Sequence, residues 1–295
     1  MLVRVIFVLC CLGTPLLGQE ISQEQKGLFK DYYRMRAAKL RFALDEQRPL
    51  TMRKEPVLAW ASQVSDNFLS GDVFVWSRNG VPGMIGCIGS LGSTQSRGVF
   101  QEYHCLTREP ILPTRMEVVS NGNRRVIKTW KPPILELKPL KTEKSPSDRP
   151  KLRVLQMGQI TKSFSVYVRD NNNEDQLRMM PAPIHRYEAK RMAEGKSGVV
   201  DGAIYAFVWK TSGTDPEFLL MVECQRHDGN LSWHVAPVRI GFRPLRMDRN
   251  GVQVWSNDGR GNTLDNNSIY FGAGGGTLTP DEMKREIEAD AEKAS

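Results

Sequence analysis

The sequence lacks any apolar run long enough to cross a membrane as a helix. Its longest apolar stretch, Val5–Leu12, is far shorter than the roughly 20 residues that a bilayer span requires. Arg4 precedes this stretch, and a break over Pro15–Gly18 follows it and ends in a small residue, which is the layout of a secretory signal peptide. The sequence therefore predicts a signal peptide over residues 1–18. The mature chain is expected to be secreted or periplasmic, with no membrane span.

Cysteine is scarce once the signal peptide is set aside. Cys87, Cys105 and Cys224 remain, and this odd number leaves at least one free thiol. Export permits a disulfide, and Cys87 and Cys105 fall on successive predicted strands, but so few cysteines do not make a disulfide scaffold. We expect all three to be small, buried hydrophobic residues.

Residues at metal-ligand spacing are also lacking. The run Asp170–Asp175, rich in Asn and Asp, begins like a calcium loop but has no glycine at the sixth place and no glutamate at the twelfth, and such runs are typical of turns. The histidines never occur at the close spacing that places two ligands on one face of a helix. They are His104, His185, His227 and His234. We expect no metal site and no cofactor.

No motif for a catalytic nucleophile is present. Gly89–Ser93 has the wrong spacing for a nucleophile elbow. Gly272–Gly276 precedes a predicted helix but lacks the lysine of a phosphate-binding loop, so a flexible connector is expected there. Glu102 and His104 share one face of a predicted strand and remain as candidates for an acid/base pair. A histidine whose hydrogen bonds are satisfied within the strand is the simpler interpretation.

Acidic residues do not balance the basic ones. The chain has 41 Lys and Arg against 33 Asp and Glu, a formal net charge of +8. Basic stretches such as Lys138–Lys151 contain no interleaved aromatic residues, which a surface that stacks nucleic-acid bases would have. We expect no nucleic-acid partner. The excess charge indicates either a solvated basic surface or weak attraction to an anionic envelope polymer.

One pattern of residues is present twice. Arg115–Glu117 returns as Arg246–Asp248, and Gly71 with its aromatic strand returns at the same separation as Gly202. Self-similarity of this kind predicts an internal duplication. We predict an α+β fold of two units, each with one helix and an antiparallel sheet of about five strands, packed as a pseudo-dimer.

Each unit is expected to begin with an amphipathic helix. Residues 26–130 form the first unit and residues 151–256 the second. The apolar residues of Lys26–Leu44 and of Leu152–Val166 recur at three- and four-residue steps. The rest of each unit alternates as strands do. Three Asn-Gly pairs are hairpin signals: Asn79-Gly80, Asn121-Gly122 and Asn250-Gly251.

The connecting segments differ from the units in composition. Residues 131–150 hold five prolines among charged residues, which is typical of a linker. Residues 257–295 are predicted to be a connector rich in Gly and Asn, followed by a charged helix. Thr279 and Glu282 form a capping box for this helix, whose thin apolar stripe predicts loose docking.

The longest strands carry a signal of deep burial. Val73–Trp76 and Ile204–Trp209 are apolar on both alternating faces, which is expected of a central strand in a covered sheet. The helix of each unit covers only one face. We therefore expect the other face of each sheet to pack against the other unit.

The motifs Glu55–Trp60, Gly71–Trp76 and Asp201–Phe207 resemble a group of uncharacterised exported proteins from planctomycete bacteria. The resemblance extends over roughly Leu28–Trp255, and its motifs are structural in character. It implies export. It implies no functional residues, because no activity accompanies it.

Without a catalytic set, the sequence favours an exported, non-catalytic binding or interaction module of the cell envelope, whose partner is an anionic polymer or another protein. Pockets favour domain interfaces, so the groove between the units is the expected ligand site. Two alternatives stay open: a hydrolase that uses Glu102 and His104, and a structural envelope protein.

Two arginines are candidates for binding a ligand in this groove. If the units pack about a twofold axis, Arg115 and Arg246 would face one groove, where two guanidinium groups suit a carboxylate or sulfate. The other interpretation is that each arginine ends a strand in solvent.

Overall fold

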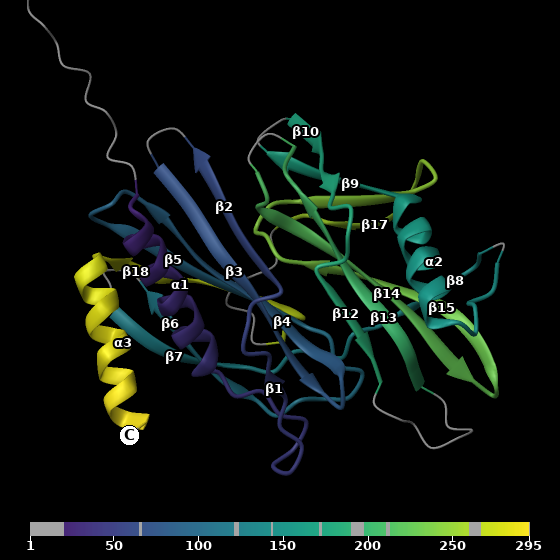
Figure 1. Cartoon of the computed structure of the whole chain (residues 1–295), viewed down its shortest axis with the longest axis horizontal. Coiled ribbons are helices and arrows are strands. Elements are labelled where there is room, and N and C mark those ends of the chain that lie inside the picture. The colour runs from purple at the N-terminus through teal and green to yellow at the C-terminus, as the bar shows by residue number, and fades with distance from the viewer. Residues whose placement is uncertain are drawn as a thin grey trace, which may run out of the picture.

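The computed structural model describes residues 21–64, 67–120, 124–142, 144–170, 173–189, 198–210, 213–259 and 267–294. The predicted signal peptide and the Asn121-Gly122 hairpin signal lie outside these residues. The described part is an α+β fold, mostly β, with helices packed on antiparallel sheets (Figure 1). None of its helices has the length and apolar character needed to cross a membrane.

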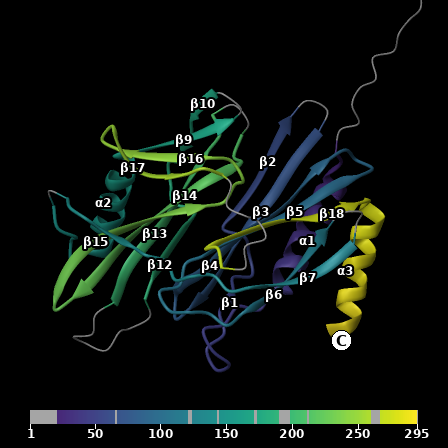
Figure 2. The ribbon, with the colours of Figure 1, turned by 180° about the vertical axis from the view of Figure 1, so that it is seen from behind.

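The first large sheet is built mainly from the N-terminal half of the chain. Its strand order is β1-β3-β4-β5-β18, and β2 pairs with β3 on the same side as β1. Figure 2 shows the C-terminal strand β18 beside β5. The strands are β1 (Thr51–Met52), β2 (Leu58–Val64), β3 (Asn67–Arg78), β4 (Val81–Gly92), β5 (Arg97–Cys105) and β18 (Tyr270–Leu278).

The second large sheet has its strands in a corresponding order. It runs β11-β13-β14-β15-β8, and β12 pairs with β13. Its edge strand β8 comes from the segment between the two halves, just as β18 follows the second half. The strands are β8 (Lys138–Leu140), β11 (Arg178–Met179), β12 (His185–Glu188), β13 (Gly198–Val208), β14 (Pro216–His227) and β15 (Asn230–Arg239).

Smaller sheets and helices cover the outer faces of the two large sheets. Strands β6 and β7 pair with each other, and the order of the remaining sheet is β10-β9-β16-β17. Helix α1 (Gln23–Ala38) lies on the first large sheet with α3 (Pro280–Ala294) beside it, and α2 (Pro150–Lys162) lies on the second (Figure 1). The strands are β6 (Thr114–Ser120), β7 (Arg124–Trp130), β9 (Phe164–Asp170), β10 (Asn173–Gln176), β16 (Leu245–Arg249) and β17 (Val252–Asn257).

A hydrophobic core joins the inner faces of the two large sheets. Val73 and Ile85 from the first sheet and Ile204 and Met221 from the second belong to this core, and all four are fully buried. Two further clusters lie under the outer helices. The expectation that each sheet packs against the other half of the chain is confirmed. Burial on both faces explains why the central strands are apolar throughout.

Tight turns join three pairs of consecutive strands. Asn79-Gly80 has φ values of 52° and 84°, and Asn250-Gly251 has 50° and 81°. These positive values match the type I′ turn that the two sequence pairs predict. Asp228-Gly229, with 48° and 81°, is a third such turn, at the β14–β15 hairpin.

Several element boundaries differ from the prediction. Helix α1 ends at Ala38, and Phe42 packs edge-on against Trp76 from the following loop, with ring centroids 5.1 Å apart. Helix α2 ends at Lys162, because the residues after it enter β9, where Val166 pairs with Met247. Packing against the sheet therefore overrides the helical period at the end of the first segment, and strand pairing does so at the end of the second.

The glycine-rich segment expected to be a connector is the edge strand β18. A Cβ atom built on Gly272 would lie 2.6 Å from Tyr270 Oη and 2.7 Å from Phe242 Cε1. Glycine here allows aromatic rings to lie against the strand. The proline-rich linker likewise contributes β8, which pairs with β15 at Trp233–Val235.

The C-terminal helix begins as predicted. Thr279 Oγ1 accepts from Glu282 N at 3.2 Å, and Glu282 Oε2 accepts from Thr279 N at 2.8 Å. Met283 is fully buried in the cluster beneath α1, so the helix is docked on α1. The cysteines Cys87, Cys105 and Cys224 are free and buried, which confirms their predicted role as small hydrophobic residues.

Two glycines on central strands lie beneath aromatic rings of the neighbouring strand. Trp60 pairs with Gly71, and Tyr187 pairs with Gly202. A Cβ on Gly71 would lie 2.8 Å from Trp60 Cζ2, and one on Gly202 would lie 2.3 Å from Tyr187 Cζ. In both strands the ring occupies the space that a side chain would need.

We expect Gly202→Ala to lower the free energy of unfolding by about 1–3 kcal/mol, because overpacking displaces a buried ring. Gly71→Ala should have a smaller effect, since its closest contact is longer. Urea denaturation measures both values. Gly274→Ala is the control, because a Cβ there meets nothing within 4 Å. Equal effects of Gly202→Ala and Gly274→Ala would contradict the close packing described.

Candidate functional site

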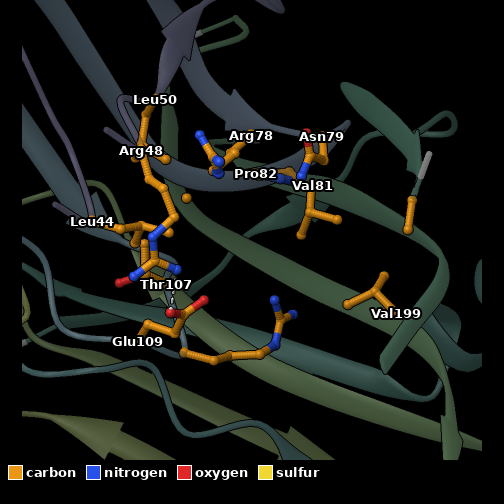
Figure 3. A pocket seen from close by; sticks show the side chains of 13 residues that line it. Leu44, Arg48, Leu50, Arg78, Asn79, Val81, Pro82, Thr107, Glu109 and Val199 are labelled. Atoms are coloured by element: carbon orange, nitrogen blue, oxygen red, sulfur yellow. Dashed lines mark hydrogen bonds and ion pairs between the residues drawn. The ribbon is translucent and has the colours of Figure 1, made fainter. Parts of the chain in front are cut away.

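A pocket of about 490 Å³ opens where the two large sheets meet. The first sheet contributes Val81 and Pro82 from β4, and the segment between α1 and β1 contributes Leu44. Val199 of β13 lies on the facing wall (Figure 3). The volume is within the range of small-molecule sites, and such sites favour interfaces of this kind. The pocket is therefore our candidate functional site, and we refer to it as the junction pocket.

Three arginines line the junction pocket, and their partners differ. Arg48 donates to Glu109 at 2.7 Å (Figure 3). Arg108 pairs with Glu223. The side chain of Arg78, at the end of β3, has no hydrogen-bond or ion-pair partner among the described residues. Arg78 is therefore the pocket arginine whose whole guanidinium group can bind an anionic group.

The carboxylate that pairs with Arg108 is buried. Glu223 of β14 is fully buried, and its Oε1 accepts from Arg108 and, at 2.7 Å, from Tyr187 Oη. Gln225 Nε2 donates to Oε2 at 2.9 Å. Burial, followed by the Glu223 charge, raises the pKa of Tyr187 well above its usual range. Both glutamate oxygens are thus satisfied, as a buried charge requires, and Arg108 is held in place.

The sequence offers a partial signal for this cluster. Glu223 follows the apolar run Phe218–Val222 within one strand, and a charge inside a buried strand needs a partner. The partners cannot be deduced from the sequence, because Arg108 lies on the other half of the chain and reaches Glu223 only through packing of the two sheets.

Glu102 and His104 share one face of β5, as predicted, but that face is the core between the sheets. Each is only 4% exposed. Tyr270 donates to Glu102, and burial raises the pKa of Glu102 well above its usual range. Burial lowers the pKa of His104 to about 4. At neutral pH His104 is therefore uncharged, burial disfavours the charged form of Glu102, and little of either surface is open to a substrate.

The structure does not bring Arg115 and Arg246 together. Arg115 is an exposed residue of β6, whose neighbour Met116 packs in the cluster under α1. Arg246 of β16 pairs with Glu174 at 2.7 Å and lies over the ring of Tyr167 at 4.2 Å. Strands β6 and β16 belong to outer sheets on opposite sides of the two-sheet core (Figures 1 and 2). No shared groove forms between the two arginines.

Two further carboxyl groups lie near Glu102: Glu217, which is buried, and Asp215, which is half-buried. Glu217 of β14 accepts from Trp209 Nε1 at 2.8 Å and from Arg243 at 2.7 Å. Burial, followed by the charge of Glu217, raises the pKa of Asp215 from 3.8 to about 8. Burial also raises the pKa of Glu217. These residues hold their protons more tightly than exposed carboxyl groups do.

No group of three or more metal-ligating side chains is found in the part of the chain that the structure describes. Comparison of the chain with protein-family models, with curated proteins and with solved structures finds no match.

Proposed function

We propose that this chain is an exported, non-catalytic binding module of the cell envelope, and that its ligand binds in the junction pocket. The observation that carries this proposal is the unpaired guanidinium group of Arg78 in a pocket whose walls are otherwise largely apolar. A few placed polar groups within apolar walls are characteristic of small-molecule sites.

We further propose that the two large sheets are the copies of a duplicated unit, packed as a pseudo-dimer. Their corresponding strand orders support this. So do the two aromatic-over-glycine pairs, Trp60 on Gly71 and Tyr187 on Gly202. Each half also supplies the last strand of the other half's sheet, since β8 joins β15 and β18 joins β5. In such an arrangement the junction pocket is a cleft between the copies.

The chemistry of the junction pocket favours a small carboxylate with an apolar chain. Arg78 supplies a planar donor pair for the carboxylate. Leu44, Leu50 and Val199 supply apolar surface for the chain. Arg48 and Arg108 are already paired with acidic side chains, so their charges are compensated and Arg78 is left to bind the ligand carboxylate.

The test uses hexanoate as the probe and isothermal titration calorimetry as the measurement. We expect Arg78→Ala to weaken hexanoate binding about 10-fold or more, because a hydrogen-bonded charge is lost. Arg115→Ala is the matched control, an exposed arginine outside the pocket, and should leave the affinity unchanged. Hexan-1-ol should bind more weakly than hexanoate. An equal loss in both variants, or no binding of hexanoate to the wild type, would contradict the proposal.

The other functions receive less support. A hydrolase that uses Glu102 and His104 would need these side chains to reach substrate, and their burial in the core argues against it. A purely structural envelope protein would be expected to have a closed junction, whereas this junction holds a pocket. Attraction of the basic surface to an anionic envelope polymer is compatible with the binding module, as an additional and salt-sensitive contact.

A further inference from the structure

A second pocket, of about 270 Å³, lies on the outer face of the first large sheet, between α1 and strands β2 and β3. We call it the outer groove. Its walls include Lys26 and Lys30 of α1. Its other lining residues include Tyr33 of α1 and Ser70 and Asp72 of β3. The junction pocket shares none of these residues, so the outer groove is a separate site.

A buried cation without an acidic partner lies behind this groove. Arg97 of β5 is fully buried. Its guanidinium group donates to the carbonyl oxygens of Phe68 at 2.8 Å and Ser90 at 2.7 Å, and it lies over the ring of Phe29 at 4.4 Å. None of the ion pairs found in the described residues includes it. Neutral acceptors therefore satisfy its hydrogen bonds but leave its charge uncompensated, and such a charge acts strongly on its surroundings at low dielectric.

Hydroxyl groups link Arg97 to the outer groove. Arg97 Nε donates to Ser90 Oγ at 2.7 Å, Ser90 Oγ lies 2.5 Å from Tyr33 Oη, and Tyr33 Oη lies 3.0 Å from Ser70 Oγ. The guanidinium group can only donate, so Ser90 Oγ accepts from Arg97 and keeps its own hydroxyl hydrogen. In each of the next two contacts either hydroxyl can be the donor, and the binding mode proposed below uses the order in which Ser90 donates to Tyr33 and Tyr33 donates to Ser70. The hydroxyl hydrogen of Ser70 then remains for an acceptor in the groove.

Asp72 gives the groove a hydrogen-bond acceptor beside the donor of Ser70. It is 4% exposed and accepts no hydrogen bond from the described residues. Burial raises its pKa to about 6, and the charges of Lys30 and Arg34 act against this rise. At neutral pH it is therefore mostly ionised and lacks a donor. A ligand that offers a hydroxyl hydrogen would satisfy a carboxylate that the protein leaves unsatisfied.

We propose that the outer groove binds a small hydroxylated carboxylate, of the size and chemistry of a sugar acid. The ligand carboxylate accepts from Ser70 and lies near the ammonium groups of Lys26 and Lys30. A ligand hydroxyl donates to Asp72. Donor and acceptor lie side by side because Ser70 and Asp72 alternate with Gly71 on β3, so both side chains face α1. The volume of the groove is at the low end for small-molecule sites, which restricts the ligand to one ring.

The experiment titrates D-glucuronate, D-glucose and acetate into the full mature chain by isothermal titration calorimetry. Glucuronate carries both recognised groups, whereas glucose lacks the carboxylate and acetate lacks the hydroxyls. We expect glucuronate to bind at least about 10-fold more tightly than either, because each comparator leaves one buried polar group unpaired. Comparable affinity for all three probes, or no heat with glucuronate, would overturn the proposal.

Variants locate the binding. We expect Ser70→Ala and Asp72→Asn each to weaken glucuronate binding about 5- to 10-fold, since the first removes the donor and the second replaces a charged acceptor with a weaker neutral one. Ser62→Ala is the matched control, because Ser62 is a buried serine of β2 that does not line the groove. Thermal unfolding checks that every variant is folded. Unchanged affinity in folded Ser70→Ala, or a loss in Arg78→Ala instead, would place glucuronate elsewhere and overturn the proposal without deciding the function of the junction pocket.

Discussion

Replacing Asp201 with alanine is expected to lower the free energy of unfolding by about 3–5 kcal/mol, because it leaves a buried arginine without its acidic partner. Asp201 is fully buried on β13 and accepts from Arg153 Nε at 3.0 Å and from Arg186 at 3.1 Å. The side chain of Arg153 is itself only 6% exposed. It also donates to the carbonyl oxygens of Ser147 and Asp148 at 3.0 and 3.1 Å. The Asp201–Arg153 pair thus ties α2 and the preceding segment to the second sheet.

The measurement is equilibrium unfolding in urea, with Glu55→Ala as the control. Glu55 pairs with Arg34 at 2.9 Å, but both side chains are well exposed, and such pairs contribute at most about 1 kcal/mol. A loss for Asp201→Ala no larger than that for Glu55→Ala would show that the buried ion pair does not hold α2 on its sheet.

The second prediction is that the free energy of unfolding falls as the pH rises above about 6.5. Burial, followed by the charge of Glu217, raises the pKa of Asp215 from 3.8 to about 8, and burial also raises the pKa of Glu102 and of Glu217. A group whose pKa is higher in the folded state stabilises the fold fully below its unfolded pKa. That contribution is lost as the pH rises through the folded pKa.

The buried histidines set the lower limit of the pH range in which only the carboxyl groups change the stability. Burial lowers the pKa of His104 and of His185 from 6.5 to about 4, so their contribution is present above 6.5 and is lost as the pH falls toward 4. Between pH 4 and 6.5 the two effects oppose each other. Above 6.5 only the carboxyl groups still titrate, and the free energy of unfolding should fall by up to about 1.4 kcal/mol per pH unit for each protonated carboxyl group.

Urea midpoints at pH 6.5 and pH 8 test this expectation. Asp215→Asn should reduce the difference between the two midpoints, because the amide does not ionise. Asp31→Asn, a change at an exposed residue of α1, should leave the difference as it is in the wild type. Equal midpoints at both pH values in the wild type, or the same difference in Asp215→Asn as in the wild type, would contradict the role given to Asp215.

Much of the sheet structure could be predicted because it depends on local pattern. The apolar run Val73–Trp76 lies within β3, and Ile204–Trp209 covers the second half of β13, which ends at Val208. Asn79-Gly80 and Asn250-Gly251 form the predicted turns, because their positive φ values are a property of the residues themselves. The Thr279 capping box likewise involves only residues within one turn. Hydrophobic alternation and turn chemistry therefore sufficed for these elements.

The edge strands show the limit of local pattern. Gly272–Gly276 has the composition of a flexible connector, and Lys138–Leu140 lies in a linker of prolines and charges, yet both belong to strands of the large sheets. Backbone hydrogen bonds to β5 and β15 make them strands, and those partners are far away in the sequence. No residue pattern within either segment indicates these partner strands.

The same division holds for the candidate sites. The sequence alone determined that Glu102 and His104 share a strand face and that no metal or nucleophile motif is present. Only the tertiary structure decided that this face is the closed core between the sheets, which withdraws the pair from solvent. It likewise placed Arg78 in a pocket facing Val199 and set Arg97 behind Ser70. Strand and turn preferences act between neighbours in sequence, whereas pockets and buried charges depend on which distant surfaces exclude water together.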